Sequence, residues 1–172
     1  MTDAQLFEVT ADAVALTGND WYTPRWIFDA AGLVFDVDVC APVNPEFRTC
    51  PARRYLTAVD DGLTAPWEGT VWMNPPYGEP SAWVDRFADH GDGLALLQMP
   101  KRTRWQARML GAADALTILN VVFTRPDGST ADVPWPIMLF AIGAESIAAL
   151  SQVATADVTT RGAYHVRPRI DD

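Results

Sequence analysis

Four consecutive residues, Asn74-Pro75-Pro76-Tyr77, follow the apolar run TVWM and combine an amide, a stiff backbone and a phenol ring. Each proline fixes its φ angle at about −65° and lacks an amide hydrogen, so the backbone here presents carbonyl oxygens without competing donors. The side-chain carbonyl of Asn74 and the backbone carbonyl of Pro75 can together accept both hydrogens of an exocyclic amino group. Such acceptors would localise the lone pair of the amino nitrogen and point this weak nucleophile outwards. Tyr77 adds a flat face on which a planar base can stack.

The same four residues also suit an ordinary turn, because Asn-Pro and Pro-Pro pairs mark turns regularly. Their position in the chain favours a ligand-binding site over an ordinary turn. TVWM, residues 70–73, reads as a short buried strand that the prolines end. In sheets of parallel strands flanked by helices, ligands bind beyond the carboxyl ends of the strands. Residues 74–77 stand at such an end.

The chain around this motif alternates strands with helices, which predicts a three-layer α/β domain with a mostly parallel sheet. Thr23 and Pro24 suit the N-cap and first position of a helix over 24–31. The segment LVFDVDVCA (33–41) alternates apolar residues with Asp36 and Asp38, which predicts a strand.

Further elements follow on both sides of the motif. We expect a helix over 81–90 with Ser81 as its cap, a doubly buried strand in GLALLQMP (93–100) and a helix over 103–113. Two β-rich runs, 115–123 and 134–143, predict an antiparallel pair that closes the sheet. The Arg-rich stretch that contains Arg48, Arg53 and Arg54 is expected to be irregular.

Length and composition limit the number of domains and the class of protein. With 172 residues, 49% of them hydrophobic, the chain suits one well-buried domain. We expect an N-terminal extension over 1–17, the α/β domain over 18–150 and a C-terminal segment over 151–172. Cys40 and Cys50 have no metal-ligand spacing, so we expect reduced thiols, no bound metal and a cytoplasmic protein. No apolar run approaches the roughly 20 residues of a membrane-spanning helix, so we expect no membrane partner.

The formal net charge of −9 argues against indiscriminate binding to nucleic acid. A local basic patch is nevertheless encoded within 101–125, a segment whose formal charge is +4 and whose single acid is Asp114. It begins at a strand end, so it should border the same edge as Asn74 and could hold phosphates. A solvated basic helix is the alternative. The candidate nucleic-acid-binding residues are Lys101, Arg102, Arg104, Arg108 and Arg125.

Taken together, these motifs resemble the phage-type DNA N6-adenine methyltransferase (Dam-like) family, small relatives of the S-adenosylmethionine-dependent amino-methyltransferases. The resemblance covers about residues 19–142, and several linked motifs in order are more specific than NPPY alone. The similar segments are NDWYTPRWIFDA (19–30), FDVDVCAPVNPEFRTC (35–50), YLTAVDDGL (55–63) with Trp67, VWMNPPYG (71–78), LALLQMPKRTRWQ (94–106) and VVF with VPWPIMLF (121–140).

The resemblance implies a Rossmann-like methyltransferase fold, S-adenosylmethionine as cofactor, DNA as partner and the exocyclic N6 of adenine as methyl acceptor. It implies that the methionine part of the cofactor contacts Trp21, Thr23 and Pro24. It places Asp38, Cys40 and Ala41 beside the cofactor. It also implies that the acidic pair Asp60 and Asp61, before the catalytic strand, binds the cofactor. The catalytic loop it implies is Asn74, Pro75, Pro76 and Tyr77. No oligomeric state follows from it.

Several of these residues have simpler readings that stay open at this stage. Asp36 and Asp38 could form an edge turned to water, although a carboxylate at a strand end also suits the cationic amine of S-adenosylmethionine. Asp60-Asp61-Gly62 could be a turn and a helix cap. Cys40 is expected to be a small apolar packing residue and not a nucleophile.

The loop after the first strand departs from the wider methyltransferase class. It reads CAPVNPEF in place of a glycine-rich loop, with no glycine between Leu33 and Asp61. This matches the small phage family. Two other acceptors, cytosine N4 and a glutamine amide, are alternatives to adenine, and so is a non-catalytic relative that binds DNA.

Overall fold

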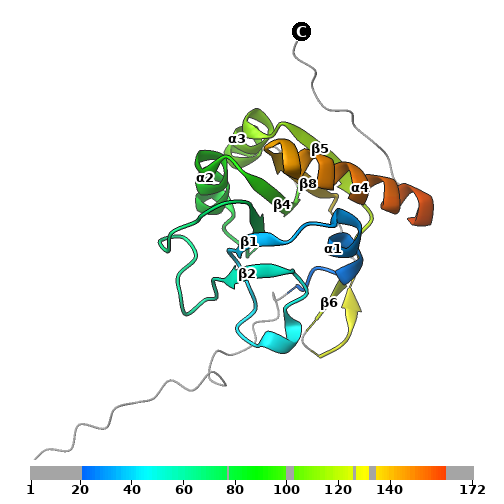
Figure 1. The fold of residues 1–172 in the computed structure, drawn as a ribbon, viewed down its shortest axis with the longest axis horizontal. Helices are drawn as coiled ribbons and strands as arrows, with labels where there is room; N and C mark the ends of the chain where they lie inside the picture. Colours follow the sequence, from blue (N-terminus) through cyan, green and yellow to red (C-terminus); the bar gives the residue numbers. More distant parts are fainter. Residues whose placement is uncertain (1–20, 77, 100–102, 126, 132–134, 162–172) are drawn as a thin grey trace, which may run out of the picture.

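A six-stranded sheet in the order β2-β1-β3-β4-β8-β5 forms the centre of the protein (Figure 1). The computed structural model describes residues 21–161 except 77, 100–102, 126 and 132–134. Strands β1, β2, β3 and β4 are parallel neighbours, whereas β8 runs antiparallel to both β4 and β5. The strands are β1 (Phe35–Asp38), β2 (Ala52–Tyr55), β3 (Val71–Met73), β4 (Gly93–Gln98), β5 (Ala115–Leu119) and β8 (Ile137–Ile142). The predicted mostly parallel sheet with a closing antiparallel pair is confirmed.

The direction of winding reverses at β1. From β1 the chain passes to β2 on one side and then returns to β3 on the other. The carboxyl ends of β1 and β3 therefore flank a topological switch point, which is where open α/β sheets bind ligands. Asp38 is the last residue of β1 and Asn74 follows β3, so both stand at this point.

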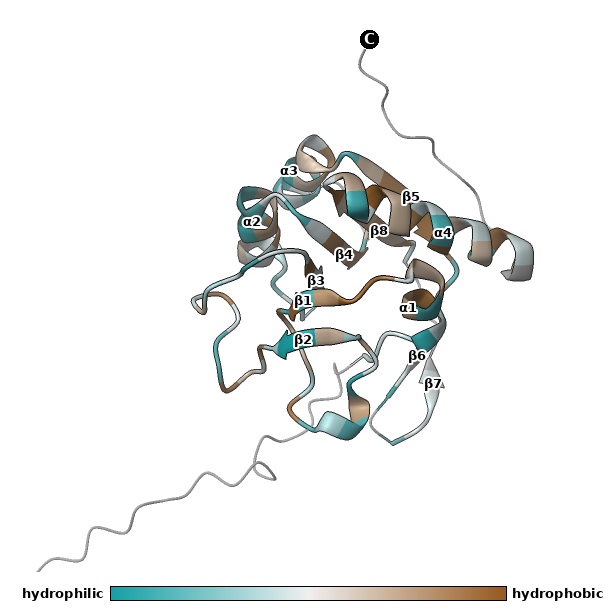
Figure 2. Ribbon diagram, viewed as in Figure 1, coloured by the Kyte–Doolittle hydropathy of each residue, from teal (hydrophilic) through white to brown (hydrophobic). Residues whose placement is uncertain are grey.

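Helices cover both faces of the sheet, which gives the predicted three layers. Helices α1 (Arg25–Ala31) and α4 (Ala144–Arg161) pack against each other, and α2 (Ser81–His90) packs against α3 (Arg104–Ala112). Each pair belongs to its own hydrophobic cluster, as the side chains of β4 show. Leu94 and Leu96 belong to the cluster of α1 and α4, whereas Ala95 and Leu97 belong to that of α2 and α3. Burial on both faces explains why β4 is an uninterrupted apolar run (Figure 2).

Two predicted helix caps are wrong. Helix α1 begins at Arg25 with Pro24 as N-cap, and no side chain caps it. The hydroxyl of Thr23 instead accepts a hydrogen bond from Asn74, a tertiary contact that local sequence does not reveal. Ser81 is the first residue of α2, and its N-cap is Pro80.

The remaining helix ends agree with the sequence. Thr103 caps α3 in a reciprocal capping box with Gln106. Gly32 and Gly91 end α1 and α2 in the left-handed conformation that glycine favours.

The stretch predicted to be irregular contains β2, which pairs with β1. Arg53 and Arg54 gave no apolar alternation because β2 lies at the edge of the sheet, where side chains can stay at the surface. The remaining small elements are the 3₁₀ helix η2 (Pro45–Phe47) and the hairpin formed by β6 (Phe123–Thr124) and β7 (Thr130–Ala131). Helix α4 crosses position 150, and Val153 and Ala154 are buried within it.

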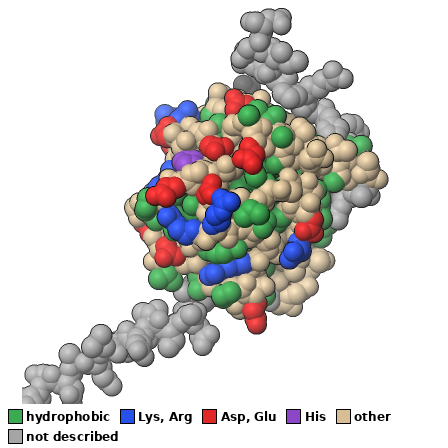
Figure 3. Space-filling model, viewed as in Figure 1, with side chains coloured by type: hydrophobic (Ala, Val, Ile, Leu, Met, Phe, Trp, Pro, Cys, Tyr) green, Lys and Arg blue, Asp and Glu red, His purple; other side chains and the backbone are tan. Residues whose placement is uncertain are grey.

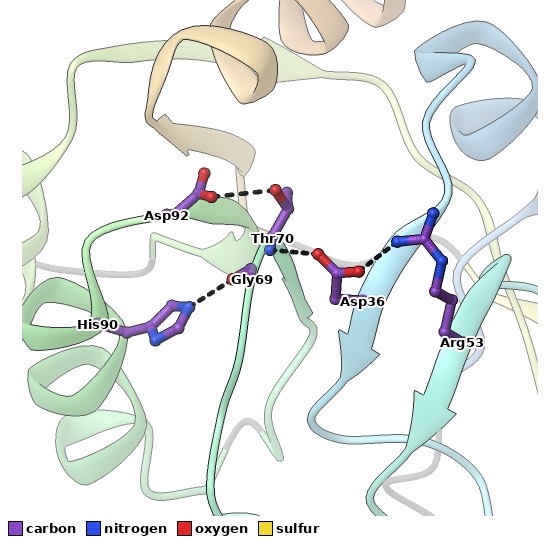
Figure 4. Close-up of polar contacts among 6 residues, drawn as sticks. All are labelled: Asp36, Arg53, Gly69, Thr70, His90 and Asp92. Carbon is purple, nitrogen blue, oxygen red and sulfur yellow. Dashed lines mark hydrogen bonds and ion pairs between the residues drawn. The ribbon is translucent and has the colours of Figure 1, made fainter.

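A polar network fixes the amino-terminal end of β3 (Figure 4). The amide of Thr70 donates to Asp36, 2.9 Å away, and Arg53 forms an ion pair with the same carboxylate. The hydroxyl of Thr70 donates to Asp92 at 3.0 Å. These contacts tie β2, β1 and β3 together at the end of the sheet opposite Asn74, so Asp36 has a structural role.

Candidate active site at the carboxyl ends of β1 and β3

The side-chain amide of Asn74 is held from the amino-terminal segment of the chain. Its Nδ2 donates to the carbonyl oxygen of Trp21 at 3.2 Å and to Oγ1 of Thr23 at 3.1 Å. Because a backbone carbonyl can only accept, the nitrogen of the amide and not its oxygen must face Trp21. The Nδ2 end of the Asn74 amide therefore points toward the amino-terminal segment 21–24.

The rest of the catalytic loop is only partly described. Pro75 is buried and Pro76 is exposed. Tyr77 lies outside the described residues, so its stacking role stays a prediction.

The segment that holds Asn74 is itself anchored on two sides. Thr49 donates its hydroxyl hydrogen to the carbonyl of Thr23 at 2.7 Å. The amide of Tyr22 donates to the carbonyl of Thr124 at 3.0 Å, so the segment pairs with strand β6. Tyr22 also stacks on Phe47, with ring centroids 4.7 Å apart. The structure therefore brings WYTP and NPPY together, although about 50 residues separate them.

One cation lies next to this contact. The guanidinium carbon of Arg125 lies 4.6 Å from the centroid of the Trp21 ring, which also packs edge-on against Phe123. The Nε of Arg125 is buried, and no hydrogen-bond partner for it occurs in the described part of the chain. The hairpin of β6 and β7 thus places a stacked arginine beside the residue that orients Asn74.

Asp38 ends β1 as a buried carboxyl, only 4% exposed. It accepts a hydrogen bond from the amide of Cys40 at 3.2 Å. Burial raises the pKa of Asp38 to about 7, although the Cys40 amide and the charge of Arg48 act in the opposite direction. The alternative of a solvent-facing edge is wrong for Asp38, because β1 lies between β2 and β3.

Cys40 and Ala41 continue from Asp38 along the same edge. Burial and the charge of Asp38 raise the pKa of the Cys40 thiol well above its usual value, so the thiol stays protonated and is a poor nucleophile. A hydrogen bond from the backbone amide of Asn74 lowers that pKa by less, and it places Cys40 against the catalytic loop. Ala41 is buried, and its amide donates to Leu56 at 2.8 Å.

Sequence reasoning gave Arg48 no role, yet it organises the loop after β1. Its Nε donates to the carbonyl of Pro42 at 3.0 Å and its Nη2 to that of Val43 at 3.1 Å. The guanidinium also lies 4.8 Å from the ring centroid of Tyr55. Arg48 thereby shapes the glycine-free loop. The signal that could have indicated it is its position as the one cation between the strand-end carboxylate Asp38 and the next strand.

Asp60 and Asp61 both act in turns. Asp60 accepts hydrogen bonds from the amide and the hydroxyl of Thr57, at 2.9 and 2.8 Å, and these bonds lower its pKa. Asp61 accepts from the amide of Leu63 at 3.2 Å. The buried Gly62 that follows packs against the carbonyl of Val39, which brings this loop to the end of β1. A cofactor contact for the two carboxylates stays a prediction.

The described candidates for nucleic-acid binding differ in their surroundings. Lys101 and Arg102 lie outside the described residues, and Arg104 is exposed at the start of α3. Arg108 faces α2, where it forms ion pairs with Asp85 and Asp89. On the face drawn in Figure 3, basic side chains lie among acidic ones and do not gather in one patch.

No group of three or more His, Cys, Asp or Glu side chains among the described residues could hold a metal ion. None of the described helices is both long and apolar enough to cross a membrane.

Comparisons with known proteins agree with this geometry. The family model for DNA N-6-adenine-methyltransferase (Dam) matches residues 11–121. A DNA N-6-adenine-methyltransferase of Haemophilus phage HP1 (strain HP1c1) is 39% identical over 95 residues, which cover 49% of this chain and 53% of the relative. The alignment thus spans about half the length of that relative. No solved structure gives a significant match. Because the family match covers well over half of the chain and includes both WYTP and NPPY, the protein belongs to the DNA N-6-adenine-methyltransferase (Dam) family.

Proposed function

We propose that this protein transfers a methyl group from S-adenosylmethionine to the exocyclic N6 of adenine in DNA. The observation that carries the proposal is the orientation of Asn74 at the switch point of the sheet. Trp21 and Thr23 hold its Nδ2 in place, and we propose that its Oδ1 accepts a hydrogen of the substrate amino group. The relative in phage HP1 is named for the same reaction.

The residues of the loop would act mainly by positioning. Oδ1 of Asn74 and the carbonyl of Pro75 would each accept one amino hydrogen, so the lone pair of N6 faces away from the loop. Bound S-adenosylmethionine would supply an electrophilic methyl group, which N6 takes by in-line displacement as the carbon–sulfur electron pair returns to sulfur. N6 would then release its surplus proton to solvent water. A group that holds the amino hydrogens supports the departure of that proton because it disperses the developing positive charge.

The end of β1 fits a cationic cofactor. The carboxyl of Asp38 is buried and its pKa is about 7, so a positively charged partner would favour the ionised form. S-adenosylmethionine carries an ammonium group and a sulfonium centre. We propose Asp38, Cys40 and Ala41 as the wall beside the cofactor and the segment 21–24 as the contact for its methionine part. Asp60 and Asp61 would border it from the loop that packs against Val39.

DNA would approach from the side of the β6–β7 hairpin. Arg125 brings a positive charge to the ring of Trp21, the residue whose carbonyl accepts from Asn74, and phosphates are the groups such a charge holds. An adenine in a duplex must leave the stack to reach Asn74, at a cost of a few kcal/mol. Stacking on Tyr77 at about 1–3 kcal/mol would offset part of that cost. Arg104 is a further candidate for phosphate contact.

Replacement of Asn74 tests the proposal directly. Asn74→Ala should reduce transfer of labelled methyl from S-adenosylmethionine to DNA by at least about 100-fold while the fold survives. Gln152→Ala, which removes an exposed amide on α4, is the matched control and should transfer normally. Wild-type rates in the Asn74→Ala variant would overturn the mechanism.

The acceptor atom needs a separate measurement. Mass spectrometry of nucleosides from the treated DNA should detect N6-methyladenine. Detection of N4-methylcytosine would show that cytosine, and not adenine, is the methyl acceptor. Label in a protein with none in the DNA would indicate that the acceptor is a glutamine amide. Absence of S-adenosylmethionine binding in calorimetry would show a non-catalytic relative.

A further inference from the structure

We infer that Thr23 is a positioning residue whose hydroxyl holds the amide of Asn74 in the orientation that methyl transfer requires. The inference deepens the proposed function and rests on it, since it concerns the same site. It assigns the hydroxyl of Thr23 to Asn74, so that the proposed contact of segment 21–24 with the methionine part of the cofactor would not use this hydroxyl.

The first support is how the hydroxyl is used. Thr23 is 5% exposed, and its Oγ1 accepts a hydrogen from Nδ2 of Asn74 at 3.1 Å. Helix α1 does not use this hydroxyl, because its N-cap is Pro24 and no side chain caps the helix. A buried threonine before Pro24 thus serves the loop after β3 and not its own helix.

The second support is that Thr23 is a fixed reference point. Its carbonyl is held by the hydroxyl of Thr49 at 2.7 Å, and the neighbouring Tyr22 is paired with Thr124. A side chain that orients another must itself be anchored, since otherwise the two would move together. The anchored element here is the segment 21–24, and the oriented group is the amide of Asn74.

The third support is that the two acceptors of the Asn74 amide differ in kind. Trp21 offers a backbone carbonyl, which every residue type at that position would supply. Thr23 offers a side-chain oxygen, so only this second bond depends on residue identity. Removal of the Thr23 hydroxyl would take away the one of these two bonds that depends on a side chain, so the orientation of the amide should become less well defined.

Two substitutions separate the hydroxyl from the shape of the side chain. Thr23→Val keeps the branched shape and removes the oxygen, whereas Thr23→Ser keeps the oxygen. We expect Thr23→Val to lower kcat by about tenfold or more at saturating S-adenosylmethionine and DNA, because misplacement of a reacting group can cost up to about 100-fold. Thr23→Ser should restore kcat to within about threefold of the wild type.

Binding of the cofactor product decides between the two roles of Thr23. The Kd of S-adenosylhomocysteine, measured by calorimetry, should change by less than about twofold in Thr23→Val. If Thr23→Val instead weakens this binding about tenfold and leaves kcat unchanged, the hydroxyl contacts the cofactor and the inference is wrong. Equal kcat for Thr23→Val and the wild type would also overturn it. Should Thr23→Val fail to fold, Thr23→Ala against Thr23→Ser makes the same comparison.

A spectroscopic readout keeps the inference separate from the proposed function. The side-chain amide signals of Asn74, assigned by their loss in Asn74→Ala, should exchange slowly with solvent in the wild type and faster in Thr23→Val. If the wild type methylates no DNA, the proposed function fails, and these signals still decide whether Thr23 holds Asn74. Unchanged exchange in Thr23→Val would refute the positioning role.

Discussion

The orientation of one amide determines what the loop after β3 can do. Asn74 could in principle offer its oxygen or its nitrogen to a ligand, and the carbonyl of Trp21 decides between them because it cannot donate. The nitrogen is turned toward the amino-terminal segment. At the same edge, Asp38 keeps its carboxyl buried. In the proposed function, Asn74 would accept a hydrogen of the substrate amino group and Asp38 would balance the charge of the cofactor.

Asp38→Asn tests the second of these residues. Burial raises the pKa of Asp38 from 3.8 to about 7, so the folded state binds this proton more tightly than the unfolded state. The resulting contribution to stability is fully present below about pH 4 and is lost as the pH rises through about 7. Asp38→Asn should therefore match the wild type in urea denaturation near pH 4 and exceed it near pH 8.

The same substitution should weaken the cofactor site. S-adenosylmethionine would lose a charged partner, so its Kd should rise by about tenfold or more. Calorimetry on the two proteins measures this difference. A variant that is less stable than the wild type near pH 8, or that binds the cofactor as tightly, would show that Asp38 is not a strained buried carboxyl beside the cofactor.

At the scale of elements, burial on both faces is what the sequence displays most clearly. Strands β3 and β4 are short apolar runs because helices cover both of their faces, so they were predictable. Strand β2 was missed because it forms an edge, where Arg53 and Arg54 can remain at the surface. Local patterns of apolar residues indicate burial. An edge strand is less buried, so its pattern is weak.

In the candidate site, too, some residues could be predicted from local sequence patterns and others could not. The sequence indicated Asn74 and Asp38, since each follows or ends a recognisable strand. It also favoured Thr23 as a helix cap, because a threonine before a proline satisfies that local rule. The contact between Thr23 and Asn74 joins residues 51 apart, and no local pattern encodes it. The organising role of Arg48 was likewise hidden, because its partners are backbone carbonyls.

Gly62→Ala tests how the loop of Asp60 and Asp61 is seated. A Cβ at this position would lie 2.2 Å from the carbonyl oxygen of Val39 and 2.7 Å from the ring of Trp83. The backbone of β1 cannot yield, so the loop must move away from the strand end. We expect a loss of about 1–3 kcal/mol in the free energy of unfolding by urea and weaker binding of S-adenosylmethionine.

Gly111→Ala is the matched control for that experiment. It adds the same methyl group in helix α3, where nothing lies within 4 Å of the new Cβ. Alanine favours a helix over glycine, so stability should stay the same or rise by up to about 1 kcal/mol. If both variants behave alike, the loop is not seated against the end of β1.

At the scale of the whole molecule, the proposed function requires an acidic protein to bind DNA, an acidic polymer. The formal net charge of −9 repels DNA at long range. Several described arginines are already matched by carboxylates: Arg53 by Asp36, and Arg108 by Asp85 and Asp89. Arg125 stacks on Trp21, whose carbonyl accepts from the amide of Asn74, so it stays a candidate for a phosphate contact near the site.

A pair of arginine variants tests which surface meets DNA. Arg125→Met should weaken binding to a short duplex and reduce the slope of log K against log salt by about 1, because one phosphate contact is lost. Arg108→Met should leave the affinity and the salt slope unchanged, since Arg108 is already paired with Asp85 and Asp89 of helix α2. Fluorescence anisotropy across a range of salt concentrations measures both. If Arg108→Met lowers the slope as much as Arg125→Met, phosphates also reach α3, and the basic segment 101–125 acts as one patch despite its ion pairs.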